Sequence, residues 1–599
     1  MDADFQSLVH MQRQSCERFA DNNLFGTKVN GAYEWLTYGA FALKVDHARA
    51  AMAAVGVERG QKVAIIANNC VEWAVAAYAT YSLGAHFVPM YEAQLKKDWE
   101  YILKDSETKL LLVSTSEIHT TALSLRDSVP SLERVLCFNM PDGDDAWDKH
   151  LEGGASKPVD AVFPETAEVA GLIYTSGTTG QPKGVVLSHG NFTSNVNATA
   201  ASFPFREGDV SCSFLPWAHS FGQTAELHCM MSRGAALGLA EGVKTLLDDF
   251  VLVRPTVLFS VPRVFNKIYD GVQKQIAAGS PVKRAIAGKA LAVAAKRREL
   301  RDRGEASTWL DMQYNVFDKI VFSKIRDKVG GRLRFAFSGG AALQKEVAEF
   351  CDDIGIVIFE GYGLTETSPI ASVNTPDGRK LGTIGKPIAG VQIIICDEQQ
   401  KPVADGIEGE IVIIGPNVMQ CYHNLPEQTA EVVFDLNGER AFRSGDMGVI
   451  DDNGFVKVVG RFKEQYKLEN GKYVVPTPLQ EQLQLSGYIL QCLLFGDNKP
   501  YNVVLIVPDM VACEAWAKEL GASDTSPAAL AKHPGLHDLI GRELQQHAGS
   551  FKSYERPKKW ALLPDEFTVE NGLLTPKMSM KRRLIMQQYQ DVIDALYAE

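Results

Sequence analysis

The sequence predicts an α/β protein with a large N-terminal domain of parallel or mixed sheets flanked by helices, and a small α+β C-terminal domain. The first observation is that short apolar runs alternate with stretches of helical spacing. "KVAIIANN" (62–69) precedes "CVEWAVAAYATYSLGA" (70–85), and "RLRFAFSGG" (332–340) precedes "AALQKEVAEFCDDIG" (341–355). This alternation is typical of α/β proteins with largely parallel sheets.

The second observation is a change of pattern near position 390. Residues 391–415 have the pattern of strand, turn and strand, with Asp and Gly in the turn. Residues 453–461 have the pattern of a further strand, which ends at Gly460 and Arg461. We therefore expect the N-terminal domain to span residues 1–461.

The C-terminal domain is expected at residues 462–599. Two apolar runs within 489–509 predict strands, and a charged helical insert is expected from about Met510 to Phe551. This mixture predicts a small α+β unit.

Composition is typical of globular proteins and argues against two other classes. With 599 residues, 46% of them apolar and 22% charged, the chain is too long for one ordinary core. A net charge of −12 argues against nucleic-acid binding through general basicity. The ten cysteines include no C-x-x-C pair, so reduced thiols in a cytoplasmic protein are a better interpretation than a zinc site or a redox pair.

No secretory or transmembrane segment is expected. The first nineteen residues are polar and include two aspartates, which does not fit a signal peptide. The least polar stretch, residues 73–90, contains Thr, Ser, Gly, His and Pro, and so predicts a buried helix that leads into a strand. Contact with a membrane surface stays open.

One glycine-rich stretch has the composition of a phosphate-binding loop. "YTSGTTGQPKG" (174–184) holds three glycines, four Ser or Thr hydroxyls and one lysine. It is not a Walker loop, because Pro182 stands where G-x-x-x-x-G-K-[ST] requires glycine. Glycine lets backbone N–H groups approach an anion, and the hydroxyls and the lysine add donors. The candidate ligands are Thr175, Ser176, Gly177, Thr178, Thr179, Gly180 and Lys183.

Further motifs carry glycines or acids. They are "FSGGAAL" (337–343), "EGYGLTETSP" (360–369) and "RSGDMG" (443–448), followed by "GRFKE" from Gly460. Each alone has a structural interpretation, because Gly-Gly after a strand is usually a turn and a Thr or Asp can cap a helix or close a turn. Their order along the chain is more informative than any one of them.

Together and in this order, these motifs and the glycine-rich loop resemble the adenylate-forming superfamily of acyl-CoA synthetases, luciferases and peptide-synthetase adenylation domains. The resemblance covers nearly the whole chain. The long-chain fatty acyl-CoA synthetase branch is the most similar, on residues 254–269, 355–369, 466–476 and 567–583. The resemblance implies a mobile C-terminal domain that turns at a hinge near Lys463.

The resemblance implies ATP-dependent activation of a carboxylic acid, of the long-chain fatty class. The carboxylate attacks the α-phosphate of ATP, pyrophosphate leaves, and the acyl-adenylate passes its acyl group to the thiol of CoA. Mg²⁺ would accompany ATP, since a hard cation bridges phosphate oxygens. Two alternatives stay open: a ligase that loads a carrier protein, and an acyl-binding or regulatory protein with little adenylation activity.

The resemblance also assigns roles to residues. Thr175 and Glu366 match the magnesium ligands. Asp446 matches the acid that binds the ribose hydroxyls, and Arg461 the basic residue near ribose and phosphate. His219 matches a position beside the reacting carboxylate, although a lone histidine is more often a core residue. The remaining nucleotide-site candidates are Gly339, Gly340, Ala341, Gly361, Tyr362, Gly363 and Thr365.

The C-terminal loop "LLTPKMSMKRR" departs from the family pattern. The resemblance predicts a lysine four residues after Thr575, where this chain has Ser579. Serine cannot neutralise a phosphoryl transition state as an ammonium would. Lys577 and Lys581 lie two residues to either side, and in an extended loop both side chains would share the face of Ser579. Either is a candidate catalytic lysine, Lys577 before Lys581, and the alternative is that both are solvated surface charges.

Overall fold

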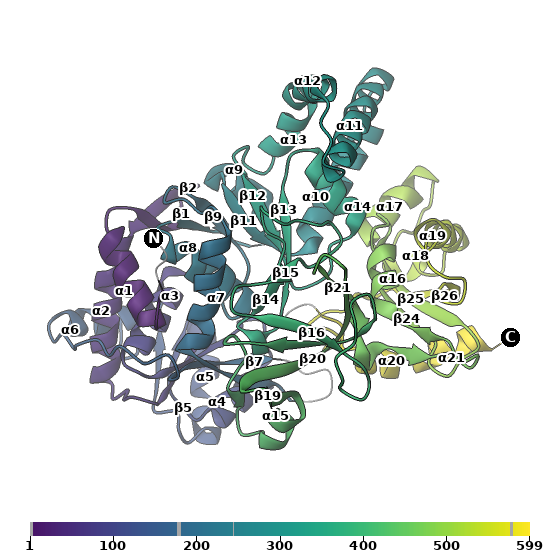
Figure 1. Ribbon diagram of the computed structural model, residues 1–599. Helices are drawn as coiled ribbons and strands as arrows, with labels where there is room; N and C mark the ends of the chain where they lie inside the picture. The colour runs from purple at the N-terminus through teal and green to yellow at the C-terminus, as the bar shows by residue number, and fades with distance from the viewer. Residues whose placement is uncertain (1–3, 176–180, 243–244, 576–578, 599) are drawn as a thin grey trace.

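The computed structural model describes residues 4–175, 181–242, 245–575 and 579–598 (Figure 1). A large N-terminal domain is followed by a smaller C-terminal domain, and helices flank parallel and mixed sheets, so the predicted fold class is confirmed. An extensive buried apolar cluster joins the sheets and helices of the N-terminal domain, from Phe5 to Val456.

The glycine-rich stretch belongs to a seven-stranded sheet of order β18-β8-β7-β4-β3-β5-β6. Strands β7, β4, β3, β5 and β6 run parallel, whereas β8 and β18 are antiparallel to their neighbours. The parallel strands are buried almost throughout, which explains their nearly continuous apolar sequences. The strands are β3 Lys62–Ile66, β4 His86–Met90, β5 Thr108–Val113, β6 Arg134–Cys137, β7 Val169–Thr175, β8 Lys183–Ser188 and β18 Cys421–Tyr422.

Two further sheets carry the motifs in the middle of the chain. A five-stranded sheet has the order β11-β12-β13-β14-β15, and a four-stranded sheet has the order β2-β1-β10-β9. The strands of the five-stranded sheet are β11 Val257–Ser260, β12 Phe335–Ser338, β13 Ile358–Gly363, β14 Ile370–Val373 and β15 Lys386–Pro387. Those of the four-stranded sheet are β1 Asn23–Val29, β2 Ala32–Thr37, β9 Val210–Ser213 and β10 Ala236–Leu239.

The change of pattern near position 390 marks an antiparallel sheet. Strands β16, β17, β20 and β19 pair in this order, and β21 pairs with β20. The predicted strand, turn and strand correspond to the first two of these. The strands are β16 Gln392–Cys396, β17 Gly409–Ile414, β19 Val433–Leu436, β20 Glu439–Ile450 and β21 Val456–Arg461.

The C-terminal domain has its own three-stranded sheet, of order β24-β25-β26, and its own apolar clusters on both faces. The predicted charged insert forms helices between the second and third strands. The main elements are α16 Pro476–Leu483, β24 Ile489–Phe495, β25 Asn502–Pro508, α17 Met510–Glu519, α19 Pro534–His547, β26 Pro557–Leu562, α20 Arg582–Gln588 and α21 Gln590–Tyr597.

A group of helices projects from the N-terminal domain (Figure 1). Helix α10 Pro262–Ala277 leads into α11 Pro281–Asp302, and α12 Thr308–Phe317 continues through a π-helical turn, Asp318–Phe322, into α13 Ser323–Asp327. Helix α11 packs against α12 and against α14 Lys345–Asp353. We call residues 281–328 the helical projection.

The least polar stretch is buried as predicted. Residues 73–90 form most of α3 Val71–Ser82 and then β4, and Trp73 to Ser82 are all buried. Across the described part of the chain, no helix combines the length and the apolar character needed to cross a bilayer. All ten cysteines lie among the described residues as free thiols, and eight of them are buried.

Candidate active site

The hairpin β7–β8 holds the two ends of the glycine-rich loop. Thr175 ends β7, Lys183 begins β8, and the two residues pair across the strands. The loop candidates Ser176, Gly177, Thr178, Thr179 and Gly180 lie outside the described residues. The hairpin therefore places a hydroxyl and an ammonium on either side of the loop.

Tyr422 connects this hairpin to the acidic motif. Its ring lies under Lys183, whose Nζ is 4.7 Å from the ring centroid, and its hydroxyl donates a hydrogen bond of 2.8 Å to Glu366 Oε1. Burial and the neighbouring Glu366 carboxylate raise the pKa of Tyr422, so the phenol stays a donor. Lys183, Tyr422 and Glu366 thus form one contiguous group.

Glycines shape the turn that presents Glu366. A Cβ on Gly363 would lie 1.7 Å from the carbonyl oxygen of Pro369, so only glycine fits there. The chain then enters a short 3-10 turn, Thr365–Thr367, and the Glu366 carbonyl accepts a hydrogen bond of 2.8 Å from Met419 N–H. A Cβ on Gly361 would lie 3.3 Å from Val373 Cγ2, which is also a tight contact. Gly361 and Gly363 therefore have a structural reason to be glycine.

Asp446 lies between two partners from the other motifs. Tyr362 donates a hydrogen bond of 2.6 Å to Asp446 Oδ2, and Arg461 Nε lies 3.1 Å from Asp446 Oδ1. Arg461 faces Asp446 because β20 and β21 pair at this position. Burial raises the pKa of Asp446, and the charge of Arg461 and the Tyr362 hydroxyl oppose that rise. The carboxylate is thus held in place by two donors.

The group around Glu366 and the group around Asp446 are close enough to interact electrostatically. The charge of Glu366 contributes to raising the pKa of Asp446, and also that of Arg461. The structure therefore brings the hairpin, the acidic motif and the β20–β21 pair together, although they are far apart in the sequence.

His219 lies beside two of the predicted motifs. Its Nδ1 accepts a hydrogen bond of 3.1 Å from Phe221 N–H, which fixes the orientation of the ring. The neighbouring Ser220 hydroxyl is 3.3 Å from that of Thr365, and a Cβ on Gly339 would lie 3.1 Å from the Phe221 ring. A π-helix, Phe221–His228, follows directly, a local geometry that is frequent at functional sites.

The Gly-Gly turn follows β12. Gly339 is buried and donates a hydrogen bond of 3.2 Å to Ser260 O. Gly340 has φ of +82°, in the left-handed region that favours glycine, and both Gly340 and Ala341 are exposed. The turn thus leaves backbone groups at the surface, next to Phe221.

The described ends of the C-terminal loop pair with each other. Thr575 N–H donates to Ser579 O at 2.8 Å, and Ser579 N–H donates to Thr575 Oγ1 at 3.2 Å. Lys581 N–H donates to Leu573 O, so Lys581 sits where the two paired arms meet helix α20. Lys577 lies outside the described residues. Leu574 and Met580 form an antiparallel bridge, so Ser579 and Lys581 lie on one paired arm, and the shared face of Ser579 and the two lysines stays a prediction.

Tyr422 was missed by the sequence reasoning. It lies in no motif, 56 residues from its partner Glu366, and its place is set by the pairing of β18 with β8. No local sequence signal distinguishes it from an ordinary buried tyrosine.

The folds of known structures agree with this architecture. The adenylation domain of a carboxylate reductase from Mycobacterium chelonae superimposes with a TM-score of 0.80 at 23% identity, covering 100% of this chain and 92% of that one. The anthranilate CoA ligase AuaEII gives a TM-score of 0.75 at 18% identity, covering 99% of both chains. The fold is that of adenylate-forming enzymes.

Sequence relatives define the family. The AMP-binding enzyme family matches residues 13–423, and the AMP-binding enzyme C-terminal domain matches residues 463–599. Long-chain-fatty-acid–CoA ligase FadD15 of Mycobacterium tuberculosis is 32% identical, covering 96% of this chain and 94% of the relative. Peroxisomal long chain acyl-CoA synthetase 7 of Arabidopsis thaliana is 30% identical, covering 97% and 85%. The chain belongs to the AMP-binding enzyme family, in its long-chain acyl-CoA ligase branch.

Proposed function

We propose that this protein is an acid–thiol ligase that activates a long-chain fatty acid with ATP and transfers it to CoA. The observation that carries the proposal is the grouping of Lys183, Glu366 and Asp446 around one site in a chain of this family. Basic and hydroxyl groups can donate hydrogen bonds to the phosphates of ATP, and a buried carboxylate can accept hydrogen bonds from the ribose hydroxyls.

The reaction divides into two displacements. A carboxylate oxygen of the fatty acid attacks the α-phosphorus of ATP, and the bond to the β-phosphate oxygen breaks to release pyrophosphate. The thiolate of CoA then attacks the acyl carbon, and AMP leaves. In the first displacement Lys183 and the glycine-rich loop would hold the β- and γ-phosphates, and His219 would lie beside the carboxylate.

Mg²⁺ fits this donor set. Thr175 and Glu366 would hold it, and it would neutralise the departing pyrophosphate. Among the described residues there is no group of three or more His, Cys, Asp or Glu side chains arranged for a metal. One carboxylate and one hydroxyl are nevertheless sufficient, because Mg²⁺ usually takes only one or two protein ligands beside phosphates and water.

The overall proposal is tested by pyrophosphate release with ATP and palmitate, followed by thioester formation on addition of CoA. We expect both products. Pyrophosphate release without a CoA thioester would instead assign a ligase for a carrier protein, and no pyrophosphate with any short, medium, long or aromatic acid would assign a binding protein.

The ten free thiols favour a reducing compartment such as the cytoplasm.

Asp446→Ala is expected to weaken ATP binding much more than fatty-acid binding. Each hydrogen bond from a ribose hydroxyl to a charged acceptor contributes about 1.5–3 kcal/mol, so the KM for ATP should rise at least about tenfold for each lost bond. Steady-state kinetics with ATP and palmitate varied in turn measure the difference. The control is Asp452→Ala, an exposed aspartate in the next turn. An unchanged KM for ATP would refute the ribose assignment.

We also propose that the C-terminal domain, residues 462–599, turns about Lys463. This residue lies in the 3-10 turn Phe462–Glu464, directly after β21, the last strand of the N-terminal domain. A hinge needs a few residues whose backbone angles change while the flanking elements stay intact.

Lys463→Pro is expected to spare adenylation and to slow thioester formation. Proline fixes φ and so blocks rotation at this residue. Pyrophosphate release and acyl transfer from supplied acyl-adenylate measure the two half-reactions separately. Lys463→Ala, which keeps the backbone free, is the control and should retain both. An equal loss in both half-reactions would place the hinge elsewhere.

Two carboxyl groups interact electrostatically where the domains meet. Glu481 on α16 lies near Glu360 on β13, and nearby Leu485 packs into the apolar cluster around α14. Burial and the Glu360 charge raise the pKa of Glu481 to about 8, and burial raises the pKa of Glu360 to about 7. Glu464 adds to the first rise, whereas Arg379 opposes the second.

This contact is expected to weaken as the pH rises. Glu481 ionises near 4.5 when exposed but near 8 when docked against Glu360, so docking loses stability as the pH rises from about 5 to 8. Energy transfer between dyes on the two domains should fall over this range. Glu481→Gln should flatten the profile, whereas Glu519→Gln, at an exposed position on α17, should not. Superimposable profiles for the parent and Glu481→Gln would contradict the assignment.

A further inference from the structure

The helical projection carries an apolar row that faces solvent. Trp309, Met312, Val316 and Ile320 follow one another at spacings of three, four and four residues, so they lie on one side of α12 and its continuation. Their exposed fractions are 63%, 54%, 56% and 47%. None of the ten residues of α12, all of them described, is buried. We call these four side chains the apolar row.

The opposite side of the same helices already has a partner. Tyr314, Phe317 and Val321, again at spacings of three and four residues, pack against the apolar cluster that includes Val347 of α14. The apolar row is therefore not needed to attach α12 to the protein. Large apolar side chains that remain exposed in a contiguous row indicate a binding surface.

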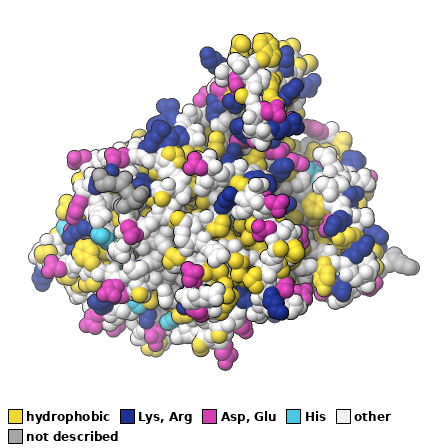
Figure 2. All heavy atoms as spheres, viewed as in Figure 1, with side chains coloured by type: hydrophobic (Ala, Val, Ile, Leu, Met, Phe, Trp, Pro, Cys, Tyr) yellow, Lys and Arg dark blue, Asp and Glu magenta, His cyan; other side chains and the backbone are white. Residues whose placement is uncertain are grey.

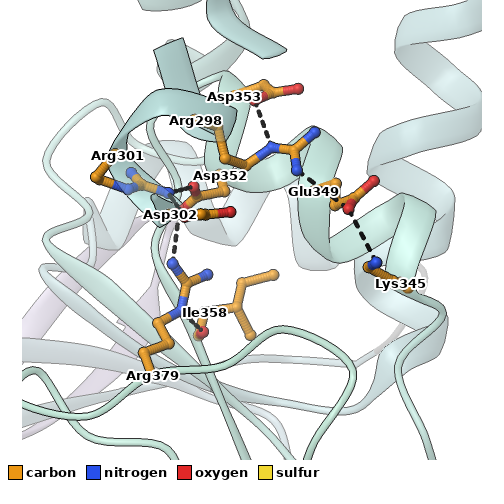
Figure 3. A network of polar contacts seen from close by, with 9 residues as sticks. All are labelled: Arg298, Arg301, Asp302, Lys345, Glu349, Asp352, Asp353, Ile358 and Arg379. Atoms are coloured by element: carbon orange, nitrogen blue, oxygen red, sulfur yellow. Dashed lines mark hydrogen bonds and ion pairs between the residues drawn. The ribbon is translucent and has the colours of Figure 1, made fainter. Parts of the chain in front are cut away.

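The projection is firmly anchored at its base. Arg298 of α11 reaches Glu349 at 3.1 Å and Asp353 at 2.9 Å, and Arg301 pairs with the buried Asp352 (Figure 3). Arg379 contacts the same Asp352 at 2.6 Å. These ion pairs and hydrogen bonds hold α11 against α14, so the apolar row is presented on a fixed support.

The charge of the projection is opposite to that of the whole protein. Residues 281–328 contain twelve Lys and Arg against six Asp and Glu, a net charge of +6, whereas the chain carries −12. Hydrophobic and basic side chains intermingle on the projection in Figure 2. Lys319 flanks the apolar row beside Ile320, and Lys324 continues it four residues further on. The exposed basic residues of the projection include Lys289, Lys296, Arg303, Lys319 and Lys324.

We propose that the helical projection docks on the anionic surface of a lipid bilayer. An exposed tryptophan and aliphatic side chains suit the boundary between headgroups and acyl chains, and flanking lysines are attracted to anionic headgroups. Pairing of two projections from two copies of this chain is disfavoured, because both projections are equally basic. The biological reason rests on the proposed function, since long-chain fatty acids partition into bilayers.

Vesicle sedimentation without substrate tests the docking separately from catalysis. The parent protein should sediment with phosphatidylcholine vesicles that contain one quarter phosphatidylglycerol, and less with phosphatidylcholine alone or in 0.5 M NaCl. The triple variant Trp309→Ser, Met312→Ser, Val316→Ser should lose at least tenfold in partitioning. Lys319→Glu with Lys324→Glu should lose binding to anionic vesicles.

The control replaces apolar residues that are equally exposed elsewhere. Val511 on α17 and Leu520, which caps the C-terminal end of this helix, have exposed fractions of 81% and 66%, and Val511→Ser with Leu520→Ser should sediment like the parent. Circular dichroism and pyrophosphate release from detergent-dispersed palmitate show that the variants are folded. Quenching by brominated lipid should affect the parent and not Trp309→Phe, if the two bind equally.

Three results would overturn the proposal. They are a parent protein that does not sediment, a triple variant that sediments as well as the parent, and an apolar row that mediates self-association in the absence of vesicles. Ultracentrifugation detects the last of these. Failure of catalysis with intact vesicle binding would instead count against the proposed function alone.

Discussion

Glu366→Ala is expected to lower pyrophosphate release by about 10²–10³-fold, the usual cost of removing one preorganised electrostatic contact. The carboxylate would no longer ligate Mg²⁺ beside the departing pyrophosphate. The Tyr422 hydroxyl, whose ring lies under Lys183, would also lose the carboxylate that accepts its hydrogen bond. Continuous pyrophosphate assays at saturating palmitate and ATP measure the loss.

Two variants separate chemistry from folding in this experiment. Glu427→Ala removes an exposed glutamate on the neighbouring helix α15 Pro426–Val432 and should retain full activity. Tyr422→Phe removes the hydrogen bond and keeps the ring under Lys183, so it should cause a smaller loss than Glu366→Ala. Pyrophosphate release at the parental rate by purified Glu366→Ala would remove this residue from the site.

Lys577→Ala is expected to have the other large effect, a loss of adenylation of about 10²–10³-fold, if its ammonium neutralises the phosphoryl transition state. Acyl transfer from supplied acyl-adenylate should change far less, because that step does not involve the α-phosphate transition state. Comparing pyrophosphate release with thioester formation from the adenylate measures the difference. Lys581→Ala is expected to have the smaller effect, since Lys581 lies at the base of the loop.

The outcome of the pair decides which lysine acts. A larger loss in Lys581→Ala would move the catalytic role to that residue. If neither substitution changes adenylation by about tenfold in an active parent protein, the lysine mechanism of the family does not extend to this chain.

Local patterns in the sequence were sufficient to predict the architecture. The apolar runs that form β3 and β12, each followed by a stretch of helical spacing, predicted the α/β alternation, and the pattern after residue 390 predicted the strand, turn and strand that form β16 and β17. These predictions succeeded because the periodicity of burial is a local property that consecutive residues show directly. The order of the glycine-rich and acidic motifs likewise indicated the family.

The side chains that meet in the site could not be identified from the sequence pattern. Tyr362 and its partner Asp446 are 84 residues apart, and Tyr422 reaches Glu366 across 56 residues. The electrostatically coupled carboxyls of Glu360 and Glu481 come from different domains. Such contacts depend on strand register and domain packing, which the local pattern of apolar residues does not specify.

The helical projection illustrates the same division. Helical spacing alone indicates that Trp309, Met312 and Val316 share a side of a helix, but not whether that side is buried. The outcome depends on what packs beside the helix: Tyr314 and Phe317 take the inner side, and Arg298 with Asp353 fixes the support. An apolar side chain becomes core or surface according to its neighbours in space, and these are set by the whole chain.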